Sequence, residues 1–132
     1  MKIIYLIKTF LRLFYYLQSN EKRYLNLLLN ILIKRPKKIL EIGVYNGRRA
    51  VQMIQAAKIF NSNIEYYGFD LFEDITNEIY ENEASKFPEM KKNIYRKLKK
   101  HAKIFLFKGF TEKTLKDFSK TKNKVDFIFI DG

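Results

Sequence analysis

The stretch at residues 37–50, KKILEIGVYNGRRA, constrains the fold of this chain more than any other. It begins with an apolar run around Leu40, which predicts a short buried strand. Gly43 and Gly47 predict a tight turn after this strand, and a helix follows the turn. Glycine lets the backbone approach a bound molecule without a Cβ in the way, and a helix start offers unpaired N–H groups and a positive dipole end. The stretch therefore predicts a strand, turn and helix that hold a charged small molecule.

The rest of the chain repeats this alternation of strand and helix. Apolar runs predict three further strands, at residues 64–70, 103–108 and 124–131. Between the strands lie three segments with helical spacing, at residues 48–60, 88–102 and 111–119, and an acidic loop at residues 71–87. Strands that alternate with helices predict an α/β fold with a parallel sheet, right-handed crossovers and helices on both faces. The near-continuous apolar run of the fourth strand predicts that it is buried on both faces.

Two helices are expected ahead of the sheet and form an N-terminal helical extension at residues 1–36, before a domain at 37–132. The first, at residues 2–17, has apolar side chains at helical spacing and Lys8 and Arg12 on its other side. Such a basic amphipathic helix packs on its own domain or a partner subunit, or else lies on an anionic membrane. The second helix, at residues 21–34, is expected to bury four side chains, Tyr24, Leu27, Leu28 and Ile31.

The composition limits the classes of partner. The formal net charge of the 132 residues is +12, which fits a surface for nucleic acid or anionic membrane, or else the lysine-rich codon usage of an AT-rich genome. The lysines are scattered and form no recognised nucleic-acid module, so no specific nucleic-acid partner is expected. The chain has no cysteine, which excludes a disulfide framework and fits a cytoplasmic protein. No apolar run reaches the ~20 residues of a membrane span.

Polar residues and glycines follow the predicted strands at the edge where ligands bind in parallel sheets. They are the turn at 43–47, Asp70, the turn at 109–111 and Asp131. Asp70 follows the first glycine turn by about twenty residues, where an acid accepts hydrogen bonds from ribose hydroxyls; the alternative is a strand-end acid that caps a loop. Asp131 is expected to bind a divalent cation or to position a substrate hydroxyl, although one carboxylate does not make a metal site.

Three further charged positions need partners. Glu41 interrupts an apolar strand, and a buried carboxylate without a partner is costly, so a ligand ammonium group or an internal arginine is expected beside it. Arg48 and Arg49 fall in the first turn of a helix, where the dipole disfavours cations. A bound carboxylate or phosphate would offset this unfavourable interaction with the dipole. The alternatives are exposure to water or an acidic neighbour such as Glu73.

The single histidine, His101, is expected to be exposed to solvent.

Three motifs, ILEIGVYNG, YYGFDLFED and VDFIFIDG, together resemble those of the class I S-adenosylmethionine-dependent methyltransferases. The sequence FDLFE at residues 69–73, together with KGFTEKTL after the third strand, is similar to that of the macrocin O-methyltransferase-like (TylF-like) branch. The resemblance covers residues 37–132. It implies a Rossmann-like sheet of seven strands, of which this chain supplies the first four. We therefore expect the N-terminal part of a longer enzyme, whose catalytic site is incomplete here.

The resemblance also implies roles for named residues in binding S-adenosylmethionine. The turn at Gly43, Tyr45, Asn46 and Gly47 would pass around the methionine part of the cofactor. Glu41 would reach its amino group through water, Asp70 would hold the ribose, and Leu71 would lie against the adenine. The turn at Gly109, Phe110 and Thr111 would flank the adenine edge, with Phe110 where many relatives have Asp or Asn. Asp131 would be the catalytic residue, as a ligand of Mg²⁺ or as a substrate-positioning group.

The function implied is methyl transfer to the oxygen of a small hydroxylated metabolite or a sugar. A general base or a metal would deprotonate the acceptor hydroxyl. The alternatives are a binding module that keeps the nucleotide fold without catalysis, and a basic protein that associates with a membrane surface through residues 1–17. The expected partners are the small-molecule acceptor and a second copy in a homo-oligomer.

Overall fold

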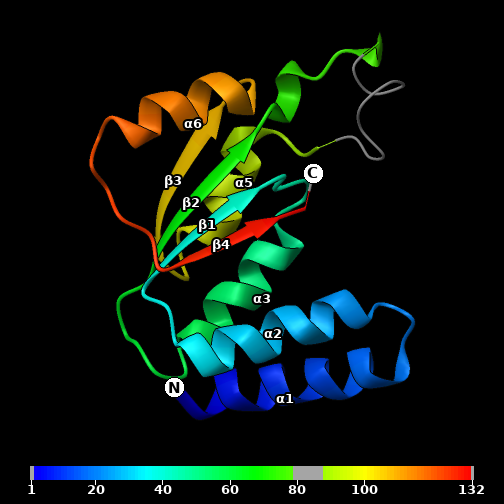
Figure 1. Ribbon diagram of the computed structural model, residues 1–132. Coiled ribbons are helices and arrows are strands. Elements are labelled where there is room, and N and C mark those ends of the chain that lie inside the picture. The colour runs from blue at the N-terminus through cyan, green and yellow to red at the C-terminus, as the bar shows by residue number, and fades with distance from the viewer. Residues whose placement is uncertain (1, 79–87, 132) are drawn as a thin grey trace.

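Four parallel strands form a single sheet in the order β3-β2-β1-β4 (Figure 1). The computed structural model describes residues 2–78 and 88–131. The strands are β1 at Lys38–Ile42, β2 at Glu65–Asp70, β3 at Lys103–Lys108 and β4 at Phe127–Ile130. This confirms the predicted α/β fold with a parallel, Rossmann-like sheet.

The strand order reverses beside β1. This strand pairs in parallel with β2 on one side, with Leu40 opposite Tyr67, and with β4 on the other, with Leu40 opposite Ile128. The crossovers thus run outward from β1 to β3 and then return to β4. Ligands of open α/β sheets bind at such a reversal, beyond the carboxyl ends of the strands. The fold therefore places the candidate site at the ends of β1 and β4.

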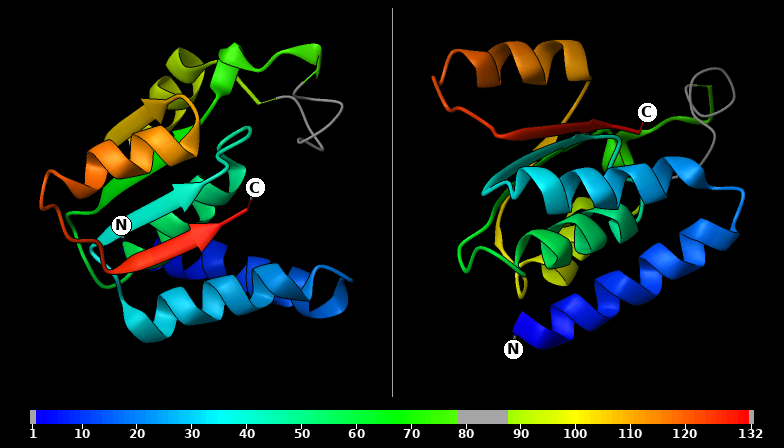
Figure 2. Two further views of the ribbon diagram at one scale, coloured as in Figure 1. Left: turned by 45° about the horizontal axis from the view of Figure 1, so that its top comes forward. Right: turned by 60° about the horizontal axis from the view of Figure 1, so that its bottom comes forward.

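Helices cover both faces of the sheet, as the sequence predicts (Figure 2). One face is covered by α3 at Arg48–Ala57 and α5 at Lys91–Leu98, and the other by α6 at Thr111–Ser119. The helix α5 is shorter than the predicted 88–102. A 3₁₀ turn, η1 at Phe72–Asp74, follows β2. The rest of the acidic loop predicted at 71–87 lies partly outside the described residues, because they exclude 79–87.

The prediction that β4 is buried on both faces is wrong. Ile128 and Ile130 are 56% and 65% exposed. The helix α6 packs over β2 instead, where Phe118 meets the rings of Tyr67 and Phe69 at centroid distances of 5.2 and 5.6 Å. One helix of this length covers only part of a face, so the described residues leave the outer half, at β4, uncovered.

Two antiparallel helices, α1 at Lys2–Gln18 and α2 at Lys22–Lys34, lie on the same side of the sheet as α3, with α2 beside α3 and α1 outermost (Figures 1 and 2). The buried face predicted for α2 is confirmed, because its members are all at most 5% exposed, namely Tyr24, Leu27, Leu28 and Ile31. They share one core cluster with residues of the sheet and α3, such as Ile39 and Met53. The division at residue 36 stays a prediction.

The helix α1 packs on the domain with the face that its sequence pattern does not favour. Thr9 and Tyr16 are each 1% exposed, and Arg12 is half-buried. The apolar stripe of its sequence, from Ile3 to Phe14, points outward. The helix thus packs on its own domain, in contact with α2 and α3, while a partner subunit or a membrane at its apolar stripe stays a prediction.

Candidate functional site

The glycine turn after β1 has the shape that the sequence predicts. Gly43 and Gly47 adopt left-handed φ angles of 86° and 75°, and Tyr45 between them has a φ of 54°. A Cβ on Gly47 would also lie 3.3 Å from a methyl carbon of Ile94 on α5. The side-chain oxygen of Asn46 accepts a hydrogen bond from the backbone N–H of Arg48, the first residue of α3, at 3.0 Å. The turn is also held from α5, because the ammonium group of Lys97 donates to the carbonyl oxygen of Asn46 at 2.9 Å.

Asp70 binds this turn directly. Its Oδ2 atom accepts hydrogen bonds from the backbone N–H groups of Val44, at 2.7 Å, and Tyr45, at 2.9 Å. Its Oδ1 atom accepts a longer bond, 3.3 Å, from the N–H of Phe72. The loop-capping alternative is thus present in the structure. A carboxylate has about four acceptor positions, so these bonds leave capacity for a ribose hydroxyl. The ribose role stays a prediction.

The turn after β3 lies against the same acid. Gly109, with a φ of 140°, donates its backbone N–H to the carbonyl oxygen of Asp70 at 3.1 Å. Phe110 is 58% exposed and precedes α6, which begins at Thr111. Leu71 is half-buried directly after Asp70. The structure therefore brings together the residues predicted to hold the ribose and adenine.

Asp131 follows β4 at the strand-order reversal. Its backbone N–H donates to the carbonyl oxygen of Ile42 at 2.8 Å, which places it beside the glycine turn. Its carboxylate forms an ion pair with Arg23 of α2, at 3.1 Å, and the Asp131 side chain is 16% exposed. The described residues contain no group of three His, Cys, Asp or Glu residues that could hold a metal ion. The catalytic and metal roles of Asp131 stay predictions.

Glu41 is fully buried, and its side-chain partner in the described residues is a tyrosine and not an arginine. The hydroxyl of Tyr66 on β2 donates to its Oε2 atom, and its Oε1 atom has no hydrogen-bond partner in the described part of the chain. Burial raises the pKa of Glu41 to about 8, against the opposing effect of the Tyr66 bond, and Asp131 and Asp70 raise it further. Glu41 is therefore largely protonated at neutral pH and carries one orphaned oxygen.

The charged residues near the turn find partners that the sequence does not indicate. Arg49 donates to the Tyr16 hydroxyl at 2.6 Å, and its guanidinium lies 3.4 Å from the ring centroid of Tyr24. Glu73 pairs with Lys108 at 3.3 Å. The backbone N–H of Lys91 is the main cause that lowers the pKa of Glu73 to about 2.

His101 is half-buried instead of exposed, which corrects the prediction. Its carbonyl oxygen accepts a hydrogen bond from the ammonium group of Lys58 at 2.7 Å. Burial lowers the pKa of the imidazole, and several nearby cations lower it further. Nothing places this side chain at the candidate site.

Sequence reasoning missed Tyr66 and Arg23. The position of Tyr66 beside Glu41 depends on the register of β1 against β2, and that of Arg23 depends on how α2 crosses the sheet. Neither has a sequence signal of its own. Together, the strand reversal, the glycine turn and the acid at the end of β2 define a class of α/β proteins with sites for nucleotide-like cofactors.

Comparison with known families identifies the class more closely. A family model described as "Methyltransferase domain" matches residues 40–132, more than half of the chain. The chain therefore belongs to this methyltransferase family. The search of curated proteins found no match.

A solved structure has the same fold. The SAH-bound methyltransferase PaMTH1 of Podospora anserina matches with a TM-score of 0.56 and 22% sequence identity, over 87% of this chain. The chain spans 42% of the length of that protein. At this identity the likeness shows the fold alone.

No helix among the described residues has the length and hydropathy needed to cross a bilayer.

Proposed function

We propose that the chain binds S-adenosylmethionine and serves class I methyl transfer to the hydroxyl oxygen of a small metabolite or a sugar. The observation that carries the proposal is the pair of hydrogen bonds from Val44 and Tyr45 to Asp70. They hold a left-handed glycine turn and a strand-end acid as one unit. Membership of the methyltransferase family and the SAH-bound state of PaMTH1 support this cofactor.

The residues present fit such a cofactor. When bound, S-adenosylmethionine supplies the methyl group as part of a sulfonium ion, and the chain supplies binding and orientation. Asp70 would accept a hydrogen bond from a ribose hydroxyl on the acceptor position that its three backbone bonds leave open. Glu41 carries a buried oxygen without a partner in the described residues, which would suit an ammonium group reached through water. Because Glu41 is largely protonated at neutral pH, binding an ammonium group there would release a proton.

Asp131 is the residue that we assign to the acceptor. It lies at the strand reversal next to the glycine turn, and its ion pair with Arg23 holds the carboxylate in place. From there it would position the acceptor hydroxyl or remove its proton. A Mg²⁺ ion at Asp131 stays a prediction, because that ion needs further oxygen ligands. The TylF-like subtype and a cytoplasmic location stay predictions as well.

Calorimetric titration with S-adenosylhomocysteine tests the cofactor assignment. The wild-type chain is expected to bind, and Asp70→Asn is expected to weaken binding by about tenfold or more through loss of a charged acceptor. Asp126→Asn is the matched control, because Asp126 likewise accepts two consecutive backbone N–H groups, at the other end of β1. Circular dichroism confirms that each variant is folded. Equal affinity of wild type and Asp70→Asn, or no binding by a folded wild type, would contradict the proposal.

A non-catalytic binding module is the alternative function. It shares the cofactor site, so titration does not separate the two functions. Incubation with labelled S-adenosylmethionine and a panel of hydroxylated metabolites does separate them, because only the enzyme forms a methylated product.

A further inference from the structure

The outward face of α1 is apolar along its whole length. Six of its side chains are between 54% and 68% exposed, namely Ile3, Ile7, Phe10, Leu11, Phe14 and Leu17. They follow the helical period, so they form one continuous stripe. Soluble monomers rarely expose so large a contiguous apolar surface, and such surfaces mark sites of protein or membrane interaction.

The same helix carries positive charge and no negative charge. Its sequence contains Lys2, Lys8 and Arg12 and neither Asp nor Glu. On the helical wheel, Lys8 lies at the border between the buried face and the apolar stripe. A helix with an apolar face and flanking cations is typical of helices that lie in the plane of a membrane surface.

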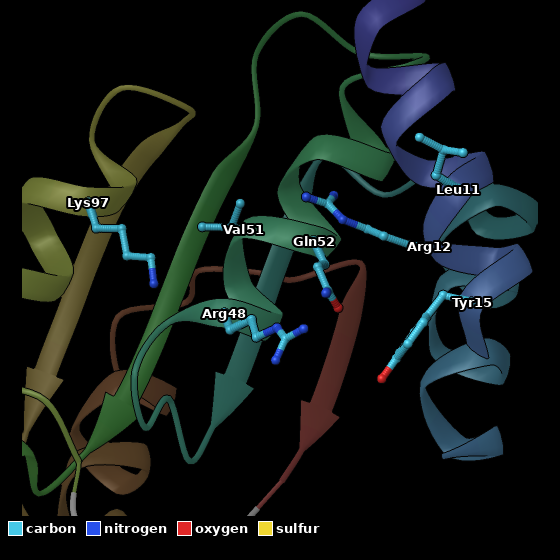
Figure 3. A pocket seen from close by; sticks show the side chains of 7 residues that line it. All are labelled: Leu11, Arg12, Tyr15, Arg48, Val51, Gln52 and Lys97. Atoms are coloured by element: carbon cyan, nitrogen blue, oxygen red, sulfur yellow. The ribbon is translucent and has the colours of Figure 1, made fainter. Parts of the chain in front are cut away.

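A basic pocket of about 380 Å³ opens beside this helix (Figure 3). Its walls come from α1, α3 and α5, and they include three cations, Arg12, Arg48 and Lys97, and no carboxylate. Leu11 and Tyr15 line the pocket from α1, and both are also exposed on the outer surface. The pocket is therefore continuous with the apolar stripe.

The guanidinium group of Arg12 is incompletely hydrogen-bonded, which favours the binding of an anion in this pocket. One of its guanidinium nitrogens, Nη1, is buried and has no hydrogen-bond partner among the described residues. Its pKa is lowered mainly by burial, and also by the nearby charge of Arg48. A phosphate group in the pocket would accept hydrogen bonds from Arg12 and offset the repulsion between the cations.

We propose that α1 docks on an anionic membrane surface, with its apolar stripe among the lipid chains and a lipid phosphate in the pocket at Arg12, Arg48 and Lys97. The positive charge of α1 favours a membrane surface over a second copy of the chain as the partner of the stripe. Two copies joined through this stripe would bring Lys8 of each helix to a contact without a carboxylate on either α1. Anionic lipids complement these cations, each of which strengthens attachment near the surface.

Vesicle co-sedimentation tests this proposal. The wild-type chain is expected to sediment with phosphatidylcholine vesicles that contain phosphatidylglycerol, and to do so less at high salt. Phe10→Glu should weaken this binding by about tenfold or more, because it places a charge in the apolar stripe. Arg48→Gln should weaken it by about fivefold. Tyr95→Glu on α5, at a site that is 48% exposed, is the matched control and should bind as wild type does.

Two results would overturn the proposal. One is a folded wild-type chain that does not bind anionic vesicles at low salt. The other is a dimer in sedimentation equilibrium that Phe10→Glu converts to a monomer while vesicle binding is unchanged. Ile7→Glu serves as a second variant should Phe10→Glu fail to fold. Phe10 and Ile7 lie on α1, so titration of their variants with S-adenosylhomocysteine stays an independent test of the cofactor site. Arg48 follows Gly47 directly and its backbone N–H bonds the Asn46 side chain, so Arg48→Gln is used in the vesicle assay alone.

Discussion

Asp70 and Asp126 make the same contact at opposite ends of the sheet. Asp70, at the carboxyl end of β2, accepts the N–H groups of two consecutive residues after β1, at 2.7 and 2.9 Å. Asp126, before β4, accepts the N–H groups of Lys37 and Lys38 at the start of β1, at 2.8 and 3.0 Å. The central strand is thus anchored at both ends by a carboxylate from a neighbouring strand. Only the Asp70 end coincides with the glycine turn.

Both anchors should contribute to stability. Asp70→Asn and Asp126→Asn each replace a charged acceptor with a neutral one, and each should lower the free energy of unfolding by about 1 kcal/mol. Urea denaturation at neutral pH measures both. A loss at Asp126 with no loss at Asp70 would show that the glycine turn does not depend on the acid that binds it.

Glu41 should make stability depend on pH. Its pKa is raised from 4.5 to about 8 by burial, so between these values the native state keeps a proton that the unfolded state releases. The free energy of unfolding therefore falls as pH rises through this window, by up to about 1.4 kcal/mol per pH unit from this group. Glu41→Gln has no proton to lose and should gain stability relative to wild type as pH rises.

Urea denaturation of wild type and Glu41→Gln between pH 5 and pH 8.5 measures this effect. The quantity compared is the difference between their free energies of unfolding, because the titration of other groups cancels in it. The difference should be small near pH 5, grow with pH and level off above about 8. A difference that does not change with pH would mean that Glu41 is not held protonated.

Gly68 makes room for the glycine turn. A Cβ at this position would lie 2.9 Å from side-chain atoms of Leu106, Tyr66 and Val44. Gly68→Ala should therefore lower the free energy of unfolding by about 1–3 kcal/mol through overpacking. It should also weaken S-adenosylhomocysteine binding, because the displaced Val44 belongs to the turn that Asp70 holds. A variant as stable as wild type would contradict this packing.

Arg49 joins α3 to the N-terminal helices through contacts that lysine cannot reproduce. Its Nη1 atom bonds the Tyr16 hydroxyl and the Gln52 side-chain oxygen at 2.6 and 3.2 Å, while the guanidinium stacks on Tyr24. Arg49→Lys should lower the free energy of unfolding by about 1–2 kcal/mol. Arg48→Lys, at an exposed neighbour, is the control and should change it by less than about 0.5 kcal/mol. Equal effects of the two substitutions in thermal or urea denaturation would contradict this role.

The sequence predicted the sheet well because strand and helix signals are local. The four strands, their parallel direction and the buried face of α2 all follow from apolar spacing and turn residues. The prediction failed where burial depends on distant neighbours. The apolar runs of β4 and α1 indicate burial, yet Ile130 and Phe10 are 65% and 67% exposed. An apolar pattern says that a surface needs a partner and does not say which one.

The candidate site divides in the same way. Its position was predictable, because glycines and acids at strand ends meet at one edge of a parallel sheet. The partners were not predictable, because Tyr66 reaches Glu41 through strand register and Arg23 reaches Asp131 through helix packing. The loop-capping role of Asp70 was foreseen as an alternative to ribose binding, and the one acceptor position that its three backbone bonds leave open makes the two roles compatible.

The most direct test of the cofactor site is an NMR titration of the ¹⁵N-labelled chain with S-adenosylhomocysteine. The amide signals of Val44 and Tyr45 should shift, together with those of residues 109–111, because these groups surround Asp70. The amides of Lys37 and Lys38, which bind Asp126 at the far end of β1, should not move. Shifts confined to the far end of the sheet, or no shifts in a folded chain at saturating ligand, would contradict a cofactor site at the Asp70 turn.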